Sequence, residues 1–245
     1  MNLFFRYGKE MLHLLYPVRC PFCDGLVDSV FGRWEYPICP QCRETIEYVT
    51  EPSCKKCGKP LEDERTEYCG DCTRKEHLFD QGKALWIYKG AVRQSIYRLK
   101  YGNRREYGIA YGQELSHRYG DWIRSRDIQL VVPIPLHKKR QRQRGFNQAE
   151  LVARELGERL HLPVCSDLLI RWRHTRPQKE LNDKERKNNL KKAFKIARNH
   201  VQLEHILLVD DIYTTGSTMD GAAEVLREAG ASRIYCMNVS IGRGY

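Results

Sequence analysis

Apolar and polar blocks alternate along the last two thirds of the chain and predict strands and helices in turn. Short apolar runs, which are typical of buried strands, lie at 83–88, 130–135, 164–172, 193–196, 206–209 and 233–240. Stretches with apolar residues at helical spacing lie between them, at 92–101, 106–124, 147–160 and 219–229. This alternation favours an α/β fold with a parallel sheet and flanking helices. In such a fold the ligand site lies beyond the carboxyl ends of the strands.

The most informative block is 206–218. Its apolar run is followed directly by Asp210 and Asp211, and then by the turn Thr214-Thr215-Gly216-Ser217-Thr218, which opens a helix. Main-chain N–H groups and hydroxyls of such a turn hold a phosphate at the positive end of a helix, while the two carboxylates accept hydrogen bonds from sugar hydroxyls. No P-loop and no dinucleotide-binding motif is present in the sequence. The block resembles the 5-phosphoribosyl-1-pyrophosphate (PRPP) motif of type I phosphoribosyltransferases; the alternative is an ordinary strand–turn–helix.

The charge of the chain is unevenly distributed. The 245 residues carry a net charge of +11, and residues 131–200 contain 18 Lys and Arg against 7 Asp and Glu, so the remainder is balanced. A basic block of this kind favours a polyanionic ligand, either pyrophosphate or nucleic acid. A solvated surface face is the alternative.

Two segments within this block are expected to join the acidic pair. The loop after Pro135 contains basic side chains that can bind a second anionic group of the ligand. The polar segment 173–192 is suited to closing over a charged ligand. Transfer of a phosphoribosyl group needs Mg²⁺ and basic donors on the departing pyrophosphate. The residues expected to bind PRPP, beside those of the turn, are His137, Lys138, Lys139 and Arg140, and those expected to act in catalysis are Asp210, Asp211, Arg176 and Lys179.

Eight of the ten cysteines form four C-x-x-C pairs. Two such pairs complete a tetrahedral four-sulfur site, so the pattern predicts two structural zinc sites; iron is the alternative metal. We expect sequential pairing, although the spacing also allows a cross-braced arrangement. The expected ligands are Cys20, Cys23, Cys39 and Cys42 in one site and Cys54, Cys57, Cys69 and Cys72 in the other.

The chain is expected to have three parts: an amphipathic segment at 1–17, a double zinc-ribbon module at 18–74, and a phosphoribosyltransferase-like domain at 80–245. The module has too few large apolar residues for a core of its own, so zinc must stabilise it. No stretch is long and apolar enough to span a bilayer, and residues 1–18 lack the features of a signal peptide. A cytoplasmic location is therefore expected, and disulfides are not expected in that reducing compartment.

Taken together, the motifs resemble the ComF family, whose members combine an N-terminal double zinc ribbon with a phosphoribosyltransferase-type domain. The resemblance covers nearly the whole chain. The resemblance rests on the following motifs: the four cysteine pairs, Leu99–Tyr101, Val131–Leu136, Arg144–Glu150, the series Thr175, Gln178, Leu181, Arg186 and Asn189, and the block 206–218. The resemblance implies that 136–140 is a pyrophosphate loop and 173–190 a flexible loop. It also implies a role in natural transformation, the uptake and handling of single-stranded DNA, with proteins of the DNA-uptake machinery as further partners.

Three functions remain open from the sequence. The first is Mg²⁺-dependent phosphoribosyl transfer from PRPP to an unknown acceptor. The second is a non-catalytic module that senses PRPP or binds nucleic acid, and the third is a zinc-ribbon nucleic-acid binder with an inert α/β domain. Tyr88, Tyr97, Tyr101 and Trp86 are candidates to stack on a base, or on single-stranded DNA beside Lys100, Arg104 and Arg105; core packing is the alternative for these aromatic residues.

Overall fold

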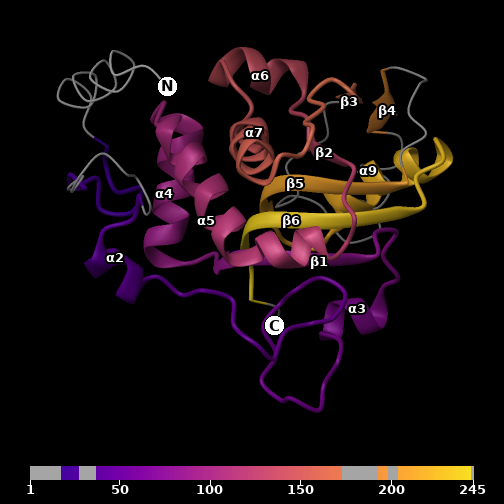
Figure 1. Cartoon of the computed structure of the whole chain (residues 1–245), viewed down its shortest axis with the longest axis horizontal. Helices are drawn as coiled ribbons and strands as arrows, with labels where there is room; N and C mark the ends of the chain where they lie inside the picture. Colours follow the sequence, from indigo (N-terminus) through magenta and orange to yellow (C-terminus); the bar gives the residue numbers. More distant parts are fainter. Residues whose placement is uncertain (1–17, 28–36, 173–192, 198–203, 244–245) are drawn as a thin grey trace.

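Four parallel strands form the central sheet of the protein. The computed structural model describes residues 18–27, 37–172, 193–197 and 204–243. The strands lie in the order β1 (Gln81–Ile87), β6 (Arg233–Ile241), β5 (His205–Tyr213) and β2 (Leu130–Pro133), and all three neighbouring pairs are parallel (Figure 1). The predicted α/β fold with a parallel sheet is confirmed.

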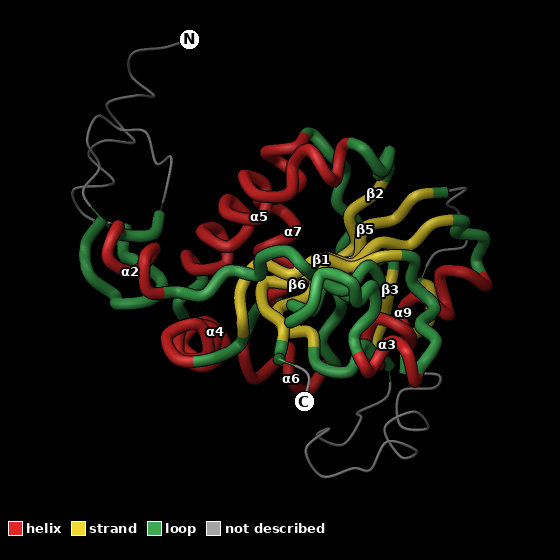
Figure 2. The backbone as a smooth tube through the Cα atoms, turned by 90° about the horizontal axis from the view of Figure 1, so that it is seen from below, coloured by secondary structure: helices red, strands yellow, loops and turns green. Residues whose placement is uncertain are grey.

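Helices cover both faces of this sheet. One face packs against α4 (Gly90–Tyr101), α5 (Glu106–Arg124) and α7 (Gln148–Leu160), and the other packs against α9 (Ser217–Glu228). The side chains of β5 alternate accordingly, because successive residues of a strand point to opposite faces: Leu207 and Val209 join the first set of helices, and Ile206 and Leu208 join α9. Figure 2 shows α5 and α7 on one side of the strands and α9 on the other.

The four predicted helices agree with α4, α5, α7 and α9 to within two residues at each end. The region 164–172 differs from its prediction, since only β3 (Leu169–Arg171) forms a strand there. It pairs antiparallel with β4 (Phe194–Ile196) in a separate two-stranded sheet, while Val164 makes a single bridge to Val131. The two short strands therefore lie outside the parallel sheet.

The stretch after Pro135 also differs from its prediction. It forms the helix α6 (Lys138–Arg144) rather than a loop, because Nδ1 of His137 accepts a hydrogen bond from the backbone N–H of Lys139 and caps the first turn. The excursion 173–192 and the segment 1–17 lie outside the described residues.

The described part of the cysteine-rich region contains turns, two isolated bridges and the short helices α2 (Pro40–Thr45) and α3 (Gly70–Arg74). Between its two halves, the chain runs along the outer edge of β1: Val49 N–H donates to the Leu85 carbonyl (2.9 Å), and Ile87 N–H donates to the Glu47 carbonyl (2.9 Å). This contact covers an edge that would otherwise expose unpaired backbone groups. The division between 74 and 80 stays a prediction, because cysteines of both halves share buried clusters with the sheet.

None of the described helices has the length and apolar character needed to cross a membrane.

Candidate functional site

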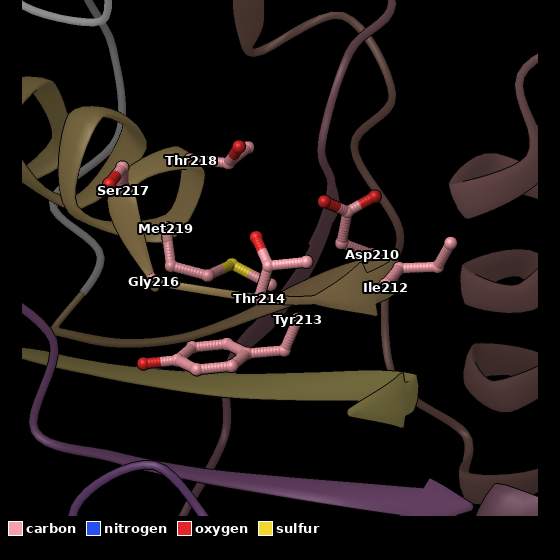
Figure 3. Close-up of a pocket in the computed structure, with 8 residues that line it drawn as sticks. All are labelled: Asp210, Ile212, Tyr213, Thr214, Gly216, Ser217, Thr218 and Met219. Carbon is pink, nitrogen blue, oxygen red and sulfur yellow. The ribbon is translucent and has the colours of Figure 1, made fainter. Parts of the chain in front are cut away.

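The turn 214–216 connects the end of β5 to α9 at the carboxyl edge of the sheet. Gly216 is the N-cap residue of α9 with φ 73°, and no side chain caps the helix there. The first N–H groups of an α-helix have no partner within the helix, so they are available to a ligand at this end. A shallow, open pocket lies at this turn (Figure 3). It is lined by Asp210, Ile212, Tyr213, Thr214, Gly216, Ser217, Thr218 and Met219.

The hydroxyl groups of the turn give the pocket a polar wall. Figure 3 shows the Asp210 carboxylate and the Thr214 side chain on one side of the chain, with the Tyr213 ring beneath it. The Thr215 and Ser217 hydroxyl oxygens lie 2.9 Å apart and share a hydrogen bond. The pocket is thus lined by Asp210 and by four of the five predicted turn residues, whereas Thr215 and Asp211 are not among its lining residues.

The two carboxylates at the end of β5 have different surroundings. Burial, together with the charge of neighbouring Asp211, raises the pKa of Asp210 to about 7, although the backbone N–H of Asp211 donates to its Oδ1 (2.8 Å). Asp211 instead forms an ion pair with Lys100, whose Nζ lies 2.7 Å from its Oδ2. The side chains of Lys100 and Asp211 are 16% and 12% exposed, so this pair is largely shielded from water.

Lys100 therefore pairs with Asp211, and its largely buried side chain is not part of an exposed basic surface. Of the two residues predicted to bind nucleic acid with it, Arg104 pairs with Asp24 (2.8 Å), and Arg105 lies over the Phe146 ring (4.8 Å). The hypothesis that Trp86 stacks on a ligand is wrong, because Trp86 is fully buried between Phe22 and Tyr111. Its core-packing alternative is the correct one.

Arg171, on β3, is a charged residue that the sequence analysis missed. Burial and the neighbouring charge of Arg140 lower the pKa of Arg171, whereas the charge of Asp210 opposes this shift. Arg140, one of the predicted PRPP-binding residues, and Asp210 are thus both near enough to Arg171 for their charges to act on it. Arg176 and Lys179 lie outside the described residues.

The cysteines gather into two tetrads, and the pairing is sequential, as expected. Within each tetrad the four sulfur atoms lie within 4.8 Å of one another. The sulfur atoms of Cys23 and Cys39 are 3.7 Å apart, and those of Cys57 and Cys69 are 3.6 Å apart. A tetrahedral site with Zn–S bonds of about 2.3 Å has edges of about 3.8 Å, so the donor sets fit Zn²⁺. We call Cys20, Cys23, Cys39 and Cys42 the first tetrad and Cys54, Cys57, Cys69 and Cys72 the second tetrad.

The tetrads belong to the two buried clusters on opposite faces of the sheet. The first contributes to the buried cluster of α4 and α5, where Phe22 meets Trp86 edge to face (5.1 Å between ring centroids). The second contributes to the cluster of α9, together with Phe79 and Tyr213. In Figure 1, α2 and α3, which carry ligands of the two tetrads, lie well apart beneath the sheet. Each metal site is thus part of a different layer of the fold.

Two family models match the chain: a double zinc ribbon domain over residues 11–73 and a phosphoribosyl transferase domain over residues 142–240. The first match supports zinc rather than iron in both tetrads. The second covers β5, the turn and α9.

Three relatives align with most of the chain. Competence protein F of Haemophilus influenzae is 31% identical over 221 residues, which cover 88% of this chain and 93% of that protein. The DNA utilization protein YhgH of Escherichia coli K12 is 31% identical over 229 residues, covering 91% of this chain and 98% of that protein. Competence protein ComFC of Bacillus subtilis is 30% identical over 200 residues, 79% of either chain. With two structural zinc tetrads and a phosphoribosyltransferase domain in this arrangement, the chain belongs to the ComF family of competence-related proteins.

Proposed function

We propose that this protein binds PRPP, with Mg²⁺, at the carboxyl edge of its sheet. One observation carries the proposal: two acidic side chains lie near the end of β5, and one of them, Asp210, lines a pocket with hydroxyl groups at the N-terminus of α9, which no side chain caps. Phosphate is favoured at such a helix end by the backbone N–H groups and by the helix dipole.

Each part of the site suits one part of that ligand. The turn 214–218 takes the 5-phosphate, and Asp210 and Asp211 accept hydrogen bonds from the ribose hydroxyls. Lys138, Lys139 and Arg140 face the pyrophosphate group, together with Arg176 and Lys179 from the excursion. The ion pair with Lys100 holds the Asp211 carboxylate in place, and the pKa of Asp210 is raised to about 7.

We further propose that the chain transfers the phosphoribosyl group to an acceptor that remains to be identified. In that reaction the bond between C1 of the ribose and pyrophosphate breaks, and its electron pair leaves with pyrophosphate. The acceptor supplies the electron pair of the new bond to C1. Mg²⁺ bound with PRPP neutralises charge on the leaving group. The ionised carboxylates stabilise positive charge that develops on the ribose.

Calorimetric titration with PRPP and Mg²⁺ tests the binding. We expect measurable binding by the unmodified protein and its loss in Asp210→Ala/Asp211→Ala. Asp121→Ala is the matched control, because its carboxylate is fully exposed on α5. Undiminished binding by the double variant refutes the site. Pyrophosphate release with candidate acceptors then separates an enzyme from a PRPP sensor, which binds without turnover.

A second candidate activity, binding of single-stranded DNA, is favoured by a patch of exposed tyrosines on α4. Tyr97 and Tyr101 are 63% and 58% exposed, and their ring centroids lie 4.8 Å apart. Arg144 of α6 lies over the Tyr101 ring at 5.1 Å. Five of the seven residues of α6 are Lys or Arg. Exposed aromatic rings beside cations suit unpaired bases and their phosphates.

The tyrosine patch is tested by fluorescence anisotropy with a labelled oligonucleotide. Stacking on aromatic side chains contributes about 1–3 kcal/mol per base, so Tyr97→Ala/Tyr101→Ala is expected to weaken binding about tenfold or more. Tyr68→Ala is the control, since that side chain is 46% exposed outside the patch. We also expect affinity to fall steeply with salt, and a flat salt dependence refutes this mode of binding.

The names of the relatives suggest the setting. We propose that the chain acts in the cytoplasm, where thiol tetrads stay reduced, on incoming single-stranded DNA and beside proteins of the DNA-uptake machinery.

A further inference from the structure

Three polar side chains from two distant segments meet beside the first turn of α9. Nδ1 of His77 lies 3.0 Å from both carboxylate oxygens of Asp220. Lys75 forms an ion pair with the same carboxylate, and the backbone N–H of Leu78 donates to it (3.1 Å). Asp220 thus accepts hydrogen bonds or ionic contacts from three residues of the segment 75–78.

This cluster is shielded from solvent. The side chains of His77, Asp220 and Lys75 are 1%, 13% and 24% exposed. Burial disfavours the charge of Asp220, but hydrogen bonds from His77 and Lys75 outweigh it and hold the pKa of Asp220 below its ordinary value. The carboxylate is therefore a fixed anion that ties the segment to α9.

The His77 ring also packs against the turn 214–216, at Gly216. A Cβ atom at Gly216 would overlap the Tyr213 hydroxyl and lie 2.7 Å from Cε1 of His77, so both rings press against the backbone of the turn. The Nε2 atom of His77 lies 3.5 Å from the Tyr213 hydroxyl. On its other side His77 stacks on Phe79, with 4.9 Å between the ring centroids. The imidazole therefore leaves little room for the turn to move toward Phe79.

The same segment is continuous with the second tetrad. Lys75 is the C-cap residue of α3, which carries Cys72, and its backbone N–H donates to the Asp71 carbonyl (2.9 Å). Three cysteines of this tetrad pack in the buried cluster that contains Phe79 and Tyr213. The first tetrad has no such connection among the described residues: its neighbour Arg43 reaches Glu114 on α5, on the other face of the sheet.

We propose that Lys75, His77 and Asp220 are positioning residues, through which zinc in the second tetrad holds the turn 214–218 in its phosphate-binding shape. This inference rests on the proposed function, because the turn is taken to bind the ligand's 5-phosphate. It assigns different roles to the two zinc sites. The second is coupled to ligand affinity, and the first stabilises the fold without affecting the turn.

The test measures binding of two probes, ribose 5-phosphate and inorganic pyrophosphate with Mg²⁺, to the zinc-loaded full chain. The variants are His77→Gln, Asp220→Asn and Lys75→Gln; the last is the mildest and serves if the buried changes prevent folding. Glu114→Gln is the matched control, since it weakens the corresponding contact of the first tetrad. Zinc content and thermal unfolding are measured for each variant.

We expect about tenfold weaker binding of ribose 5-phosphate in the three variants, with pyrophosphate binding changed less than about twofold. Glu114→Gln should leave both affinities unchanged. Hydrogen exchange of the amides of 214–219 should become faster in the three variants and not in Glu114→Gln. Equal losses for both probes, or unchanged ribose 5-phosphate affinity in variants that retain both zinc ions, overturn the proposal.

Hydrogen exchange also separates the two claims. If the unmodified protein binds neither probe, the proposed function fails, while faster exchange confined to 214–219 still supports the positioning role. Unchanged exchange there in folded variants refutes that role whatever the ligand is.

Discussion

Replacing Asp210 with Asn is expected to stabilise the folded protein while abolishing the proposed ligand binding. The pKa of Asp210 rises from 3.8 to about 7 on folding, because the carboxylate is buried beside Asp211. Each pKa unit corresponds to about 1.36 kcal/mol, so keeping this group ionised in the folded chain costs at most about 4 kcal/mol. The pocket keeps Asp210 in partial contact with water, and we expect about half of that, ~2 kcal/mol, to be recovered at pH 8.

The sign of the pH dependence follows from the direction of the shift. A carboxyl group whose pKa is higher in the folded than in the unfolded chain favours folding while it is protonated. That contribution is full below about pH 4 and is lost as the pH rises through about 7. The gain in Asp210→Asn over the unmodified protein should therefore shrink from ~2 kcal/mol at pH 8 to less than about 1 kcal/mol at pH 5.

Urea unfolding of the zinc-loaded proteins at the two pH values measures this difference without changing ionic strength. The amide oxygen of Asn can still accept the hydrogen bond from the Asp211 N–H group. Asp211→Asn is the control, with an effect of opposite sign: it leaves the shielded Lys100 unpaired and should cost about 1–3 kcal/mol. If Asp210→Asn is no more stable than the unmodified protein at pH 8, the argument from burial is wrong.

Three further changes test other parts of the fold. Gly216→Ala should lower the free energy of unfolding by about 2 kcal/mol or more in urea titrations, because φ is 73° and the new methyl group meets two rings; an unaltered transition contradicts it. Asn147→Ala should cost about 2 kcal/mol by the same measurement, since the side chain caps α7 and donates to the Ile134 carbonyl (3.0 Å), and Asn147→Asp, which keeps the cap, should cost less. Glu114→Gln should lower the melting temperature by several degrees, because Glu114 is 3% exposed and its carboxylate accepts hydrogen bonds from Tyr48 (2.7 Å) and Arg43 (3.3 Å). An equal drop in the melting temperature of Asp121→Ala would show that burial is not the cause.

The local parts of this structure could be predicted from the sequence because they have local causes. Amphipathic spacing predicts the bounds of α5, and the order of apolar, acidic and hydroxyl residues predicts the turn 214–216 after β5. The cysteine spacing indicates the two tetrads, since each C-x-x-C turn supplies two thiolates on its own.

The parts that could not be predicted depend on contacts between distant segments. Lys100 meets Asp211 because the last turn of α4 lies beside the end of β5, and no pattern around either residue indicates that contact. The same holds for His77, whose partner lies 143 positions further along the chain. Three residues do not specify a strand partner, so the antiparallel pairing of β3 with β4 could not be predicted from their sequences.

The pairing of β1 with β6 has a consequence for how the protein is made. All eight cysteines of the tetrads lie at or before residue 72, yet β1 pairs with β6, which begins only at residue 233. The tetrads can thus capture metal before β6 has been synthesised, while the apolar surfaces around them stay uncovered until β6 joins the sheet. A chain that terminates before residue 233 would carry both zinc ions and still lack the strand that joins its beginning to its end. Such a product would expose the apolar side chains around the second tetrad and become a substrate for cellular proteases.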